Sequence, residues 1–148
     1  MLALTKKTGY ALVAMTHLAG REGSVTSARD IARWVGAPQA LLMNVLKELA
    51  AGGFVESIRG ARGGYRLARP LEQINLADVV EAMEGPVRLA ECMTAPGEHH
   101  ECTGERMARC PIHDPVHRVQ RKLNDFLKKV TLADIVEPEK ATSDRSDK

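Results

Sequence analysis

Three cysteines and a histidine in the second half of this 148-residue chain have side chains and spacing suited to binding a metal. They are Cys92, Cys102, Cys110 and His113, in the pattern Cys-x9-Cys-x7-Cys-x2-His. Thiolates bind soft and borderline metals, so the set can complete a tetrahedral zinc site or hold an iron–sulfur cluster. Three unconnected thiols are the alternative. The grouping of every cysteine of the chain within nineteen residues favours a site, and the odd number disfavours a disulfide framework.

The cysteines lie in a stretch that neighbouring elements must hold in place. Leu89 to His113 is polar, and its hydrophobic residues are too scattered for a packed element. So long a loop in a small domain is expected to be functional or to be ordered by a ligand. We therefore predict a cluster-binding loop at residues 87–113. Asp114-Pro115 predicts the N-cap and first position of a helix directly after it.

Further toward the amino terminus, residues 54–70 predict a hairpin with a basic tip. Two short runs of near-alternating apolar and polar residues flank Arg59-Gly-Ala-Arg-Gly-Gly64, which is typical of strands joined by a glycine-rich turn. Arg59 and Arg62 are candidate contacts to DNA because guanidinium groups suit phosphate oxygens and guanine edges. Gly63 lets the backbone pass close to such a surface.

The two helices predicted before the hairpin form a helix-turn-helix. Ser27-Ala-Arg-Asp30 resembles a capping box that opens the first, and Pro38 suits the first position of the second. Amide and ammonium groups can bond base edges, and small apolar side chains can touch thymine methyls. The outward face of the second helix offers such groups at Gln39, Ala40, Met43, Asn44 and Lys47. Followed by the hairpin, this order predicts a winged helix-turn-helix DNA-binding domain over residues 1–86, in a mainly α fold with one small β-hairpin.

The helix after the cysteine loop carries an apolar seam. Steps of four and three residues connect Ile112, Val116, Val119, Leu123, Phe126 and Val130. Such a seam packs either on the chain's own core or on a second copy. Because two-fold operators favour dimers, we interpret residues 114–136 as a dimerisation helix with a return segment. Residues 137–148 are polar and charged, which predicts a disordered tail.

Charge is distributed unevenly along the chain. Residues 1–70 hold ten Lys/Arg against four Asp/Glu, and residues 71–148 hold eleven against fifteen. A basic amino-terminal half indicates a polyanionic partner there. No apolar run of about 18 residues and no signal peptide is evident, so we expect a soluble cytoplasmic protein without membrane contact. No nucleophile–base pair, nucleotide loop or paired carboxylates indicate an enzyme.

The sequence resembles the IscR/NsrR/CymR group of bacterial winged-helix transcription regulators over roughly residues 1–136. Leu4-Thr5-Lys6 and residues 46–55, 59–70, 74–86 and 130–136 carry the resemblance. Cluster-bearing members keep three cysteines in this loop, and Cys110-Pro-Ile-His113 is similar to the end of the IscR motif, in which the histidine is a ligand. The resemblance thus implies a [2Fe–2S] cluster on three cysteines and His113 as first choice, and [4Fe–4S] as second.

Two positions depart from the relatives. Met43-Asn44 stands where many relatives have Glu-Gln, so their operator sequence is not transferable. Gly9 stands where nitric-oxide-sensing relatives take an acidic fourth ligand from the other subunit.

Motifs and resemblance together predict a homodimeric transcription regulator, a repressor, whose affinity for operator DNA depends on an iron–sulfur cluster that senses iron, redox state or nitric oxide. One alternative keeps DNA binding but replaces the cluster with structural zinc or redox thiols. Another is an adaptor whose winged helix binds protein.

Overall fold

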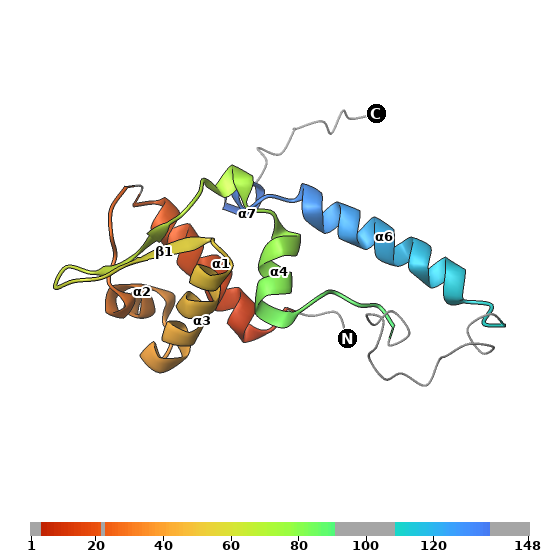
Figure 1. Cartoon of the computed structure of the whole chain (residues 1–148), viewed down its shortest axis with the longest axis horizontal. Helices are drawn as coiled ribbons and strands as arrows, with labels where there is room; N and C mark the ends of the chain where they lie inside the picture. The colour runs from red at the N-terminus through yellow and green to blue at the C-terminus, as the bar shows by residue number, and fades with distance from the viewer. Residues whose placement is uncertain (1–3, 22, 91–108, 137–148) are drawn as a thin grey trace, which may run out of the picture.

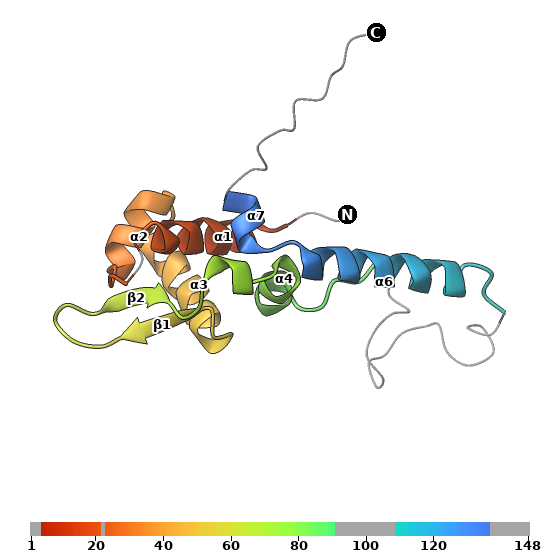
Figure 2. The ribbon, with the colours of Figure 1, turned by 90° about the horizontal axis from the view of Figure 1, so that it is seen from above.

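A computed structural model describes residues 4–21, 23–90 and 109–136 of the chain (Figure 1). It is an elongated molecule with a compact helical part at one end and a long helix projecting from it (Figures 1 and 2). In chain order the elements are α1 (Lys6–Ala19), α2 (Ala28–Val35), α3 (Gln39–Ala51), β1 (Val55–Ile58), β2 (Gly64–Leu67), the 3-10 helix η1 (Leu71–Gln73), α4 (Leu76–Glu84), α6 (His113–Lys129) and α7 (Leu132–Val136). The mainly helical fold with one hairpin and a long C-terminal helix confirms the predicted fold class.

The core lies where α1, α2, α3, α4 and the hairpin meet. It is filled by aliphatic side chains at helical spacing, because the chain has few aromatic residues. The fully buried members include Ala11, Met15, Ile31, Leu42, Val45, Leu46, Leu49, Ile74, Val79 and Leu132. Ser27 starts α2 as the capping motif predicts: its Oγ accepts from Asp30 N at 3.1 Å and donates to Asp30 Oδ2 at 2.7 Å. The capping therefore fixes α2 at the start of the helix-turn-helix.

The hairpin is an antiparallel pair in which Val55 faces Leu67 and Ile58 faces Gly64. A bridge between Thr26 and Tyr65 adds the loop before α2 to its second strand, with both backbone hydrogen bonds at 2.8–2.9 Å. Gly64 is required at this contact, because a Cβ on it would collide with the Thr26 carbonyl. The base of the hairpin is therefore fixed to the helical core.

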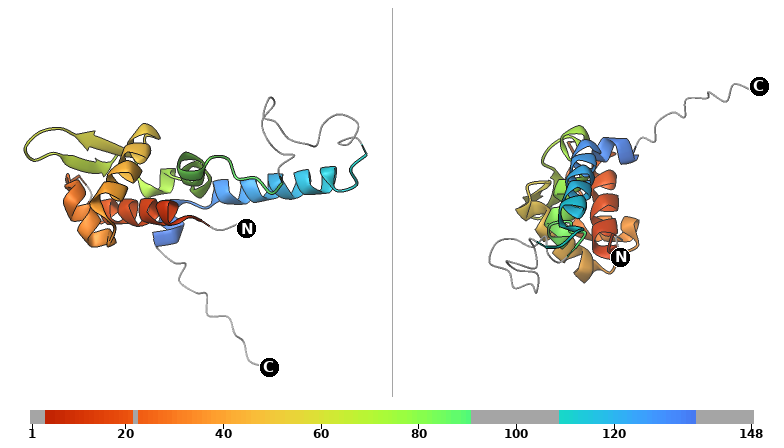
Figure 3. Two further views of the ribbon diagram at one scale, coloured as in Figure 1. Left: turned by 90° about the horizontal axis from the view of Figure 1, so that it is seen from below. Right: turned by 90° about the vertical axis from the view of Figure 1, so that its right-hand side faces the viewer.

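α6 leaves the compact part of the molecule and is anchored at its C-terminal end. There Leu76 N donates to Val130 O at 2.8 Å and Leu132 N donates to Ile74 O at 2.7 Å, around a bridge between Asn75 and Thr131. Leu132 is itself part of the core. The first residues of α6 and the hairpin tip lie at opposite ends of the long axis (Figures 1 and 3).

The start of α6 differs from the prediction. The helix begins at His113 with Ile112 at the N-cap, whereas the sequence predicts Asp114 as N-cap. His113 N donates to the carbonyl of Cys110 at 3.3 Å, so a turn over residues 110–113 leads directly into the helix. The Asp114 carboxylate is engaged by His113 instead of by a backbone amide.

Candidate nucleic-acid interface and metal centre

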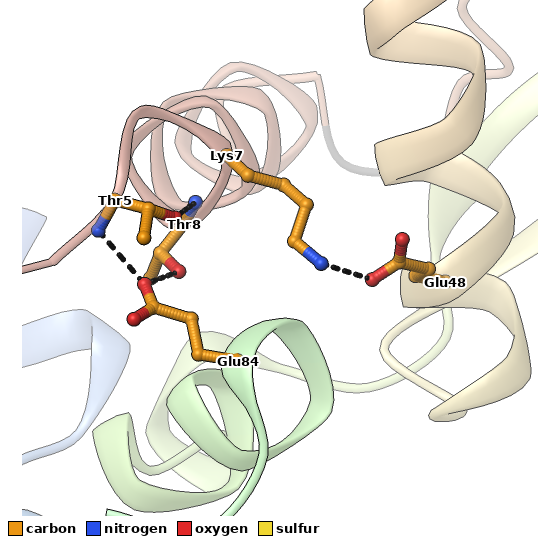
Figure 4. A network of polar contacts seen from close by, with 5 residues as sticks. All are labelled: Thr5, Lys7, Thr8, Glu48 and Glu84. Carbon is orange, nitrogen blue, oxygen red and sulfur yellow. Dashed lines mark hydrogen bonds and ion pairs between the residues drawn. The ribbon is translucent and has the colours of Figure 1, made fainter.

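The outward face of α3 is formed by the residues that the sequence assigns to base reading. Gln39, Ala40, Asn44 and Lys47 are exposed and Met43 is half-buried, while the opposite face of α3 packs into the core. An ion pair of 2.9 Å between Lys7 Nζ and Glu48 Oε2 ties α3 to the first turn of α1 (Figure 4). As the second helix of the helix-turn-helix, α3 is the recognition helix, and it thus presents its polar face from a fixed position.

The four arginines of the hairpin fall into two groups. Arg66 pairs with Glu56 across the strands at 2.8 Å, and the Arg69 guanidinium lies 4.9 Å from the centroid of the Phe54 ring. Arg59 and Arg62, at the tip, are exposed and form no ion pair within the part of the chain that the structure describes. Of the hairpin's arginines, Arg59 and Arg62 are therefore the two without a charged or aromatic partner among the described residues, whereas Arg66 and Arg69 each have a structural partner.

Gly63 contributes to the shape of the hairpin tip, and its assignment as a DNA contact stays a prediction. Its φ is not in the left-handed region, but a Cβ there would collide with the carbonyl of Ile58 and come within 2.9 Å of the Gly60 carbonyl. Gly60 takes a φ of 126°. The glycines therefore shape the tip so that its arginines project outward.

Two of the four candidate metal ligands, Cys110 and His113, fall within the described residues, and Cys92 and Cys102 lie outside them. His113 Nδ1 is 3.0 Å from Asp114 Oδ1. The hydrogen bond from His113 lowers the pKa of the Asp114 carboxyl, so this carboxylate is ionised and accepts, and Nδ1 carries the proton. In a neutral imidazole with this tautomer, Nε2 is the nitrogen with the lone pair. It is buried and has no hydrogen-bond partner among the described residues.

A carboxylate that fixes the tautomer of a histidine in this way is the usual companion of an imidazole that ligates a metal. The described donor atoms therefore fit a metal or an iron–sulfur cluster. Residues 4–21, 23–90 and 109–136 contain no group of three His, Cys, Asp or Glu side chains close enough to hold a metal ion. A complete site thus needs donors beyond them, as the prediction of Cys92 and Cys102 requires.

His117 belongs to this end of α6, and the sequence analysis did not single it out. Its ring centroid is 4.4 Å from that of His113, and its Nε2 is also buried without a hydrogen-bond partner in the described residues. The spacing of four residues on one helix was the available signal.

Gln120, one turn further, is the buried residue of α6. Its Oε1 accepts from Leu89 N at 2.8 Å, and its Nε2 donates to Val87 O at 2.7 Å and to Asn124 Oδ1 at 2.8 Å. This side chain holds one segment against α6, namely the residues that lead from α4 into the cysteine loop. Its contacts span 31 and 33 residues, and no local pattern indicates them.

Glu84 makes a similar long-range contact at the start of α1. Its Oε1 accepts from Thr5 N at 2.8 Å and from the hydroxyl of Thr8 (Figure 4). The hydrogen bond from Thr8, followed by that from Thr5, lowers the pKa of Glu84. The last residue of α4 therefore secures the first turn of α1 as a carboxylate.

A helix-turn-helix with an exposed polar recognition helix, followed by a hairpin with free arginines at its tip, defines a winged-helix DNA-binding protein. The family model described as "Iron-dependent Transcriptional regulator" matches residues 4–138, and the chain belongs to this family, Rrf2.

Similar proteins support both the family and the fold. The HTH-type transcriptional regulator NsrR of Bacillus licheniformis is 32% identical over 136 residues, 91% of this chain and 92% of that protein. CymR, the global cysteine regulator of B. subtilis, has a TM-score of 0.67 at 28% identity, covering 92% of this chain and 97% of that one. IscR of T. potens has a TM-score of 0.62 at 26% identity, covering 91% and 86%. These findings confirm the resemblance, and they identify the chain as a DNA-binding transcription regulator and not an enzyme.

Among the described helices, none combines the length and the apolar character needed to cross a membrane.

Proposed function

We propose that this Rrf2-family regulator is a homodimeric, sequence-specific repressor in the cytoplasm whose affinity for operator DNA is controlled by an iron–sulfur cluster. The observation that carries the proposal is the arrangement at the start of α6. His113, three residues after Cys110, has its Nδ1 held by Asp114 and its Nε2 buried and unpartnered in the described residues. A buried imidazole nitrogen is costly without a partner, and a metal ion is a partner that would satisfy it.

The proposed ligands are Cys92, Cys102, Cys110 and His113, with a [2Fe–2S] cluster as first choice and [4Fe–4S] as second. When bound, such a cluster supplies a redox-active centre whose potential depends on its ligands and on the hydrogen bonds around it. Asp114 orients the His113 ring, and α6 fixes both residues on a rigid element. Iron supply, redox state and nitric oxide are the candidate signals.

DNA reading is assigned to the exposed residues of α3 and to the tip of the hairpin. Asn44 and Gln39 can bond adenine edges, Lys47 can bond guanine or phosphate, and Ala40 and Met43 can contact thymine methyls. Arg59 and Arg62 are the proposed phosphate contacts, because their charges are not used within the described part of the protein.

Dimerisation is assigned to the seam of α6. Ile112, Val119 and Phe126, spaced by seven residues, are 63%, 55% and 61% exposed, whereas Val116, Leu123 and Val130 are half-buried. Large apolar side chains that recur on one exposed helix face are typical of a contact to another helix. A second copy of this chain is the proposed partner.

Metal and sulfide content tests the cluster directly. Protein purified without oxygen should contain iron and acid-labile sulfide and absorb visible light, and Cys110→Ala should lose all three while its secondary structure stays that of the parent. Zinc in place of iron and sulfide, or a metal-free protein, would refute the cluster.

The second candidate retains the regulator but replaces the cluster with structural zinc or redox-active thiols. The similarity to CymR favours it, since that relative is named as a regulator of cysteine. Zinc at one equivalent per chain, or thiols that change operator affinity on oxidation in metal-free protein, would establish it. The protein-binding adaptor has no support from the family.

A further inference from the structure

We infer that a polar network centred on Gln120 couples α6 to the recognition helix, and that Gln120 is the positioning residue that sets the angle between them. The inference rests on the proposed function for the signal that arrives at α6. It concerns residues outside the metal site and outside the DNA-contacting face.

The network begins where Gln120 holds the strap, which is the name given to residues 85–89 that lead from α4 into the cysteine loop. Both functional groups of the Gln120 amide are used on the strap, one by Leu89 N and one by Val87 O, at 2.8 and 2.7 Å. Gln120 is 8% exposed. Loss of this side chain leaves two backbone groups of the half-buried strap without their partners, which makes Gln120 the polar fastening of strap to helix.

The strap is attached at its other end through Glu84, the residue directly before it. Glu84 accepts from Thr5 N and the Thr8 hydroxyl in the first turn of α1. Lys7, in the same turn, forms its ion pair with Glu48 of α3 at 2.9 Å (Figure 4). Contacts that the structure shows therefore run without a gap from α6, through the strap and α1, to the recognition helix.

The position of Gln120 along α6 explains why this fastening matters. The C-terminal end of α6 is anchored at Val130, where the backbone leaves the helix and becomes extended, with a ψ of 114°. A helix anchored at one end can pivot there. Gln120 lies ten residues from that anchor, about 15 Å at 1.5 Å per residue, and His113 lies about 25 Å from it. A pivot of about 10° moves the His113 end by about 4 Å on this geometry. The fastening by Gln120 therefore acts together with the packing of α6 on α4 to set the position of that end.

The network joins the start of α6 to the recognition helix, so its arrangement can be shifted either by a change at α6 or by DNA bound at α3. A change at the start of α6 alters the angle of the helix, and Gln120 transmits it to the strap and so to α1 and α3. Coupling of this kind is reciprocal, so DNA that favours one placement of α3 favours one angle of α6.

The experiment compares Gln120→Met with Asn124→Ala. Methionine keeps the unbranched shape of glutamine but has neither its amide donor nor its carbonyl acceptor. Asn124 accepts from Gln120 and does not bond the strap, so its variant is the matched control. Hydrogen exchange at the Leu89 amide is measured in metal-free protein, and operator affinity is measured with and without the cluster.

In the parent and in Asn124→Ala the Leu89 amide should be protected. In Gln120→Met it should exchange faster, and the ratio of operator affinities between the two forms should shrink about threefold or more, with iron and sulfide content unchanged. Parental exchange at Leu89, or a parental affinity ratio, in Gln120→Met would overturn the inference. Absence of iron and sulfide from the parent would instead refute the proposed function, and the exchange measurement on Leu89 would still decide whether Gln120 fastens the strap.

Discussion

The division of the hairpin arginines gives a quantitative prediction for DNA binding. Arg62→Ala removes an exposed cation at the tip, whereas Arg66→Ala removes one that Glu56 already neutralises at 2.8 Å. Each phosphate contact contributes about 0.9 to the slope of log affinity against log salt concentration. The proposed dimer carries two wings, so Arg62→Ala should reduce that slope by about 1.8.

Over a fourfold increase in salt concentration, the affinity of Arg62→Ala relative to that of the parent should therefore rise about twelvefold. The free energy of unfolding should change by less than about 0.5 kcal/mol, because the Arg62 side chain is exposed at a turn. Arg66→Ala should leave the slope at the parental value and cost at most about 1 kcal/mol of stability through the lost ion pair.

Titration of fluorescent operator DNA by anisotropy at several salt concentrations measures all three proteins. A parental slope in Arg62→Ala, or an equal reduction in both variants, would show that the free charge at the tip is not what contacts DNA.

Asn44→Ala should lose about 1–3 kcal/mol of discrimination at particular base pairs, and unchanged preferences in binding-site selection would contradict base reading by this face. Phe126→Asp, at a position 61% exposed, should yield folded monomers in sedimentation, and a persisting dimer would remove the seam from the interface. Burial, followed by the charge of Arg21, lowers the pKa of His17 below 6.5, so the unfolded chain binds its proton more readily. Stability should therefore fall as the pH drops below about 6.5, and urea unfolding of His17→Phe should show less of this loss, whereas an equal loss would contradict it. His113→Cys should keep a cluster with a lower midpoint potential in an anaerobic redox titration, and a parental potential would exclude His113 as a ligand.

Local chemistry explains why the fold could be predicted from the sequence. The Ser27 capping motif, the helical spacing of apolar residues in α3 and the glycines of residues 60–64 each act over a few residues, and together they give the winged helix. The resemblance to known regulators indicated the family, and the match of the Rrf2 family model to residues 4–138 confirms it. The two free arginines could not be separated from the two structural ones, because Glu56 meets Arg66 only once the strands pair in register.

The polar network could not be predicted, because its contacts join residues far apart in the chain. Glu84 bonds Thr5 across 79 residues, Lys7 bonds Glu48 across 41, and Gln120 bonds Val87 across 33. Glu84, Lys7 and Gln120 are polar residues on helices, and the sequence pattern predicts only that such residues face the solvent. The assignments of Cys92 and Cys102 as ligands, and of residues 137–148 as a disordered tail, fall outside the described residues and stay predictions.

Operator affinity of one preparation, measured with and without the proposed cluster, tests whether that cluster controls DNA binding. Protein purified without oxygen is titrated against operator DNA, stripped of iron by an anaerobic chelator, titrated again, and then reconstituted with iron and sulfide. We predict that stripping changes the affinity by at least about fivefold and that reconstitution restores it, as expected for coupling between two sites. Equal affinity of all three samples, with iron and sulfide present in the first and third, would contradict control of DNA binding by the cluster.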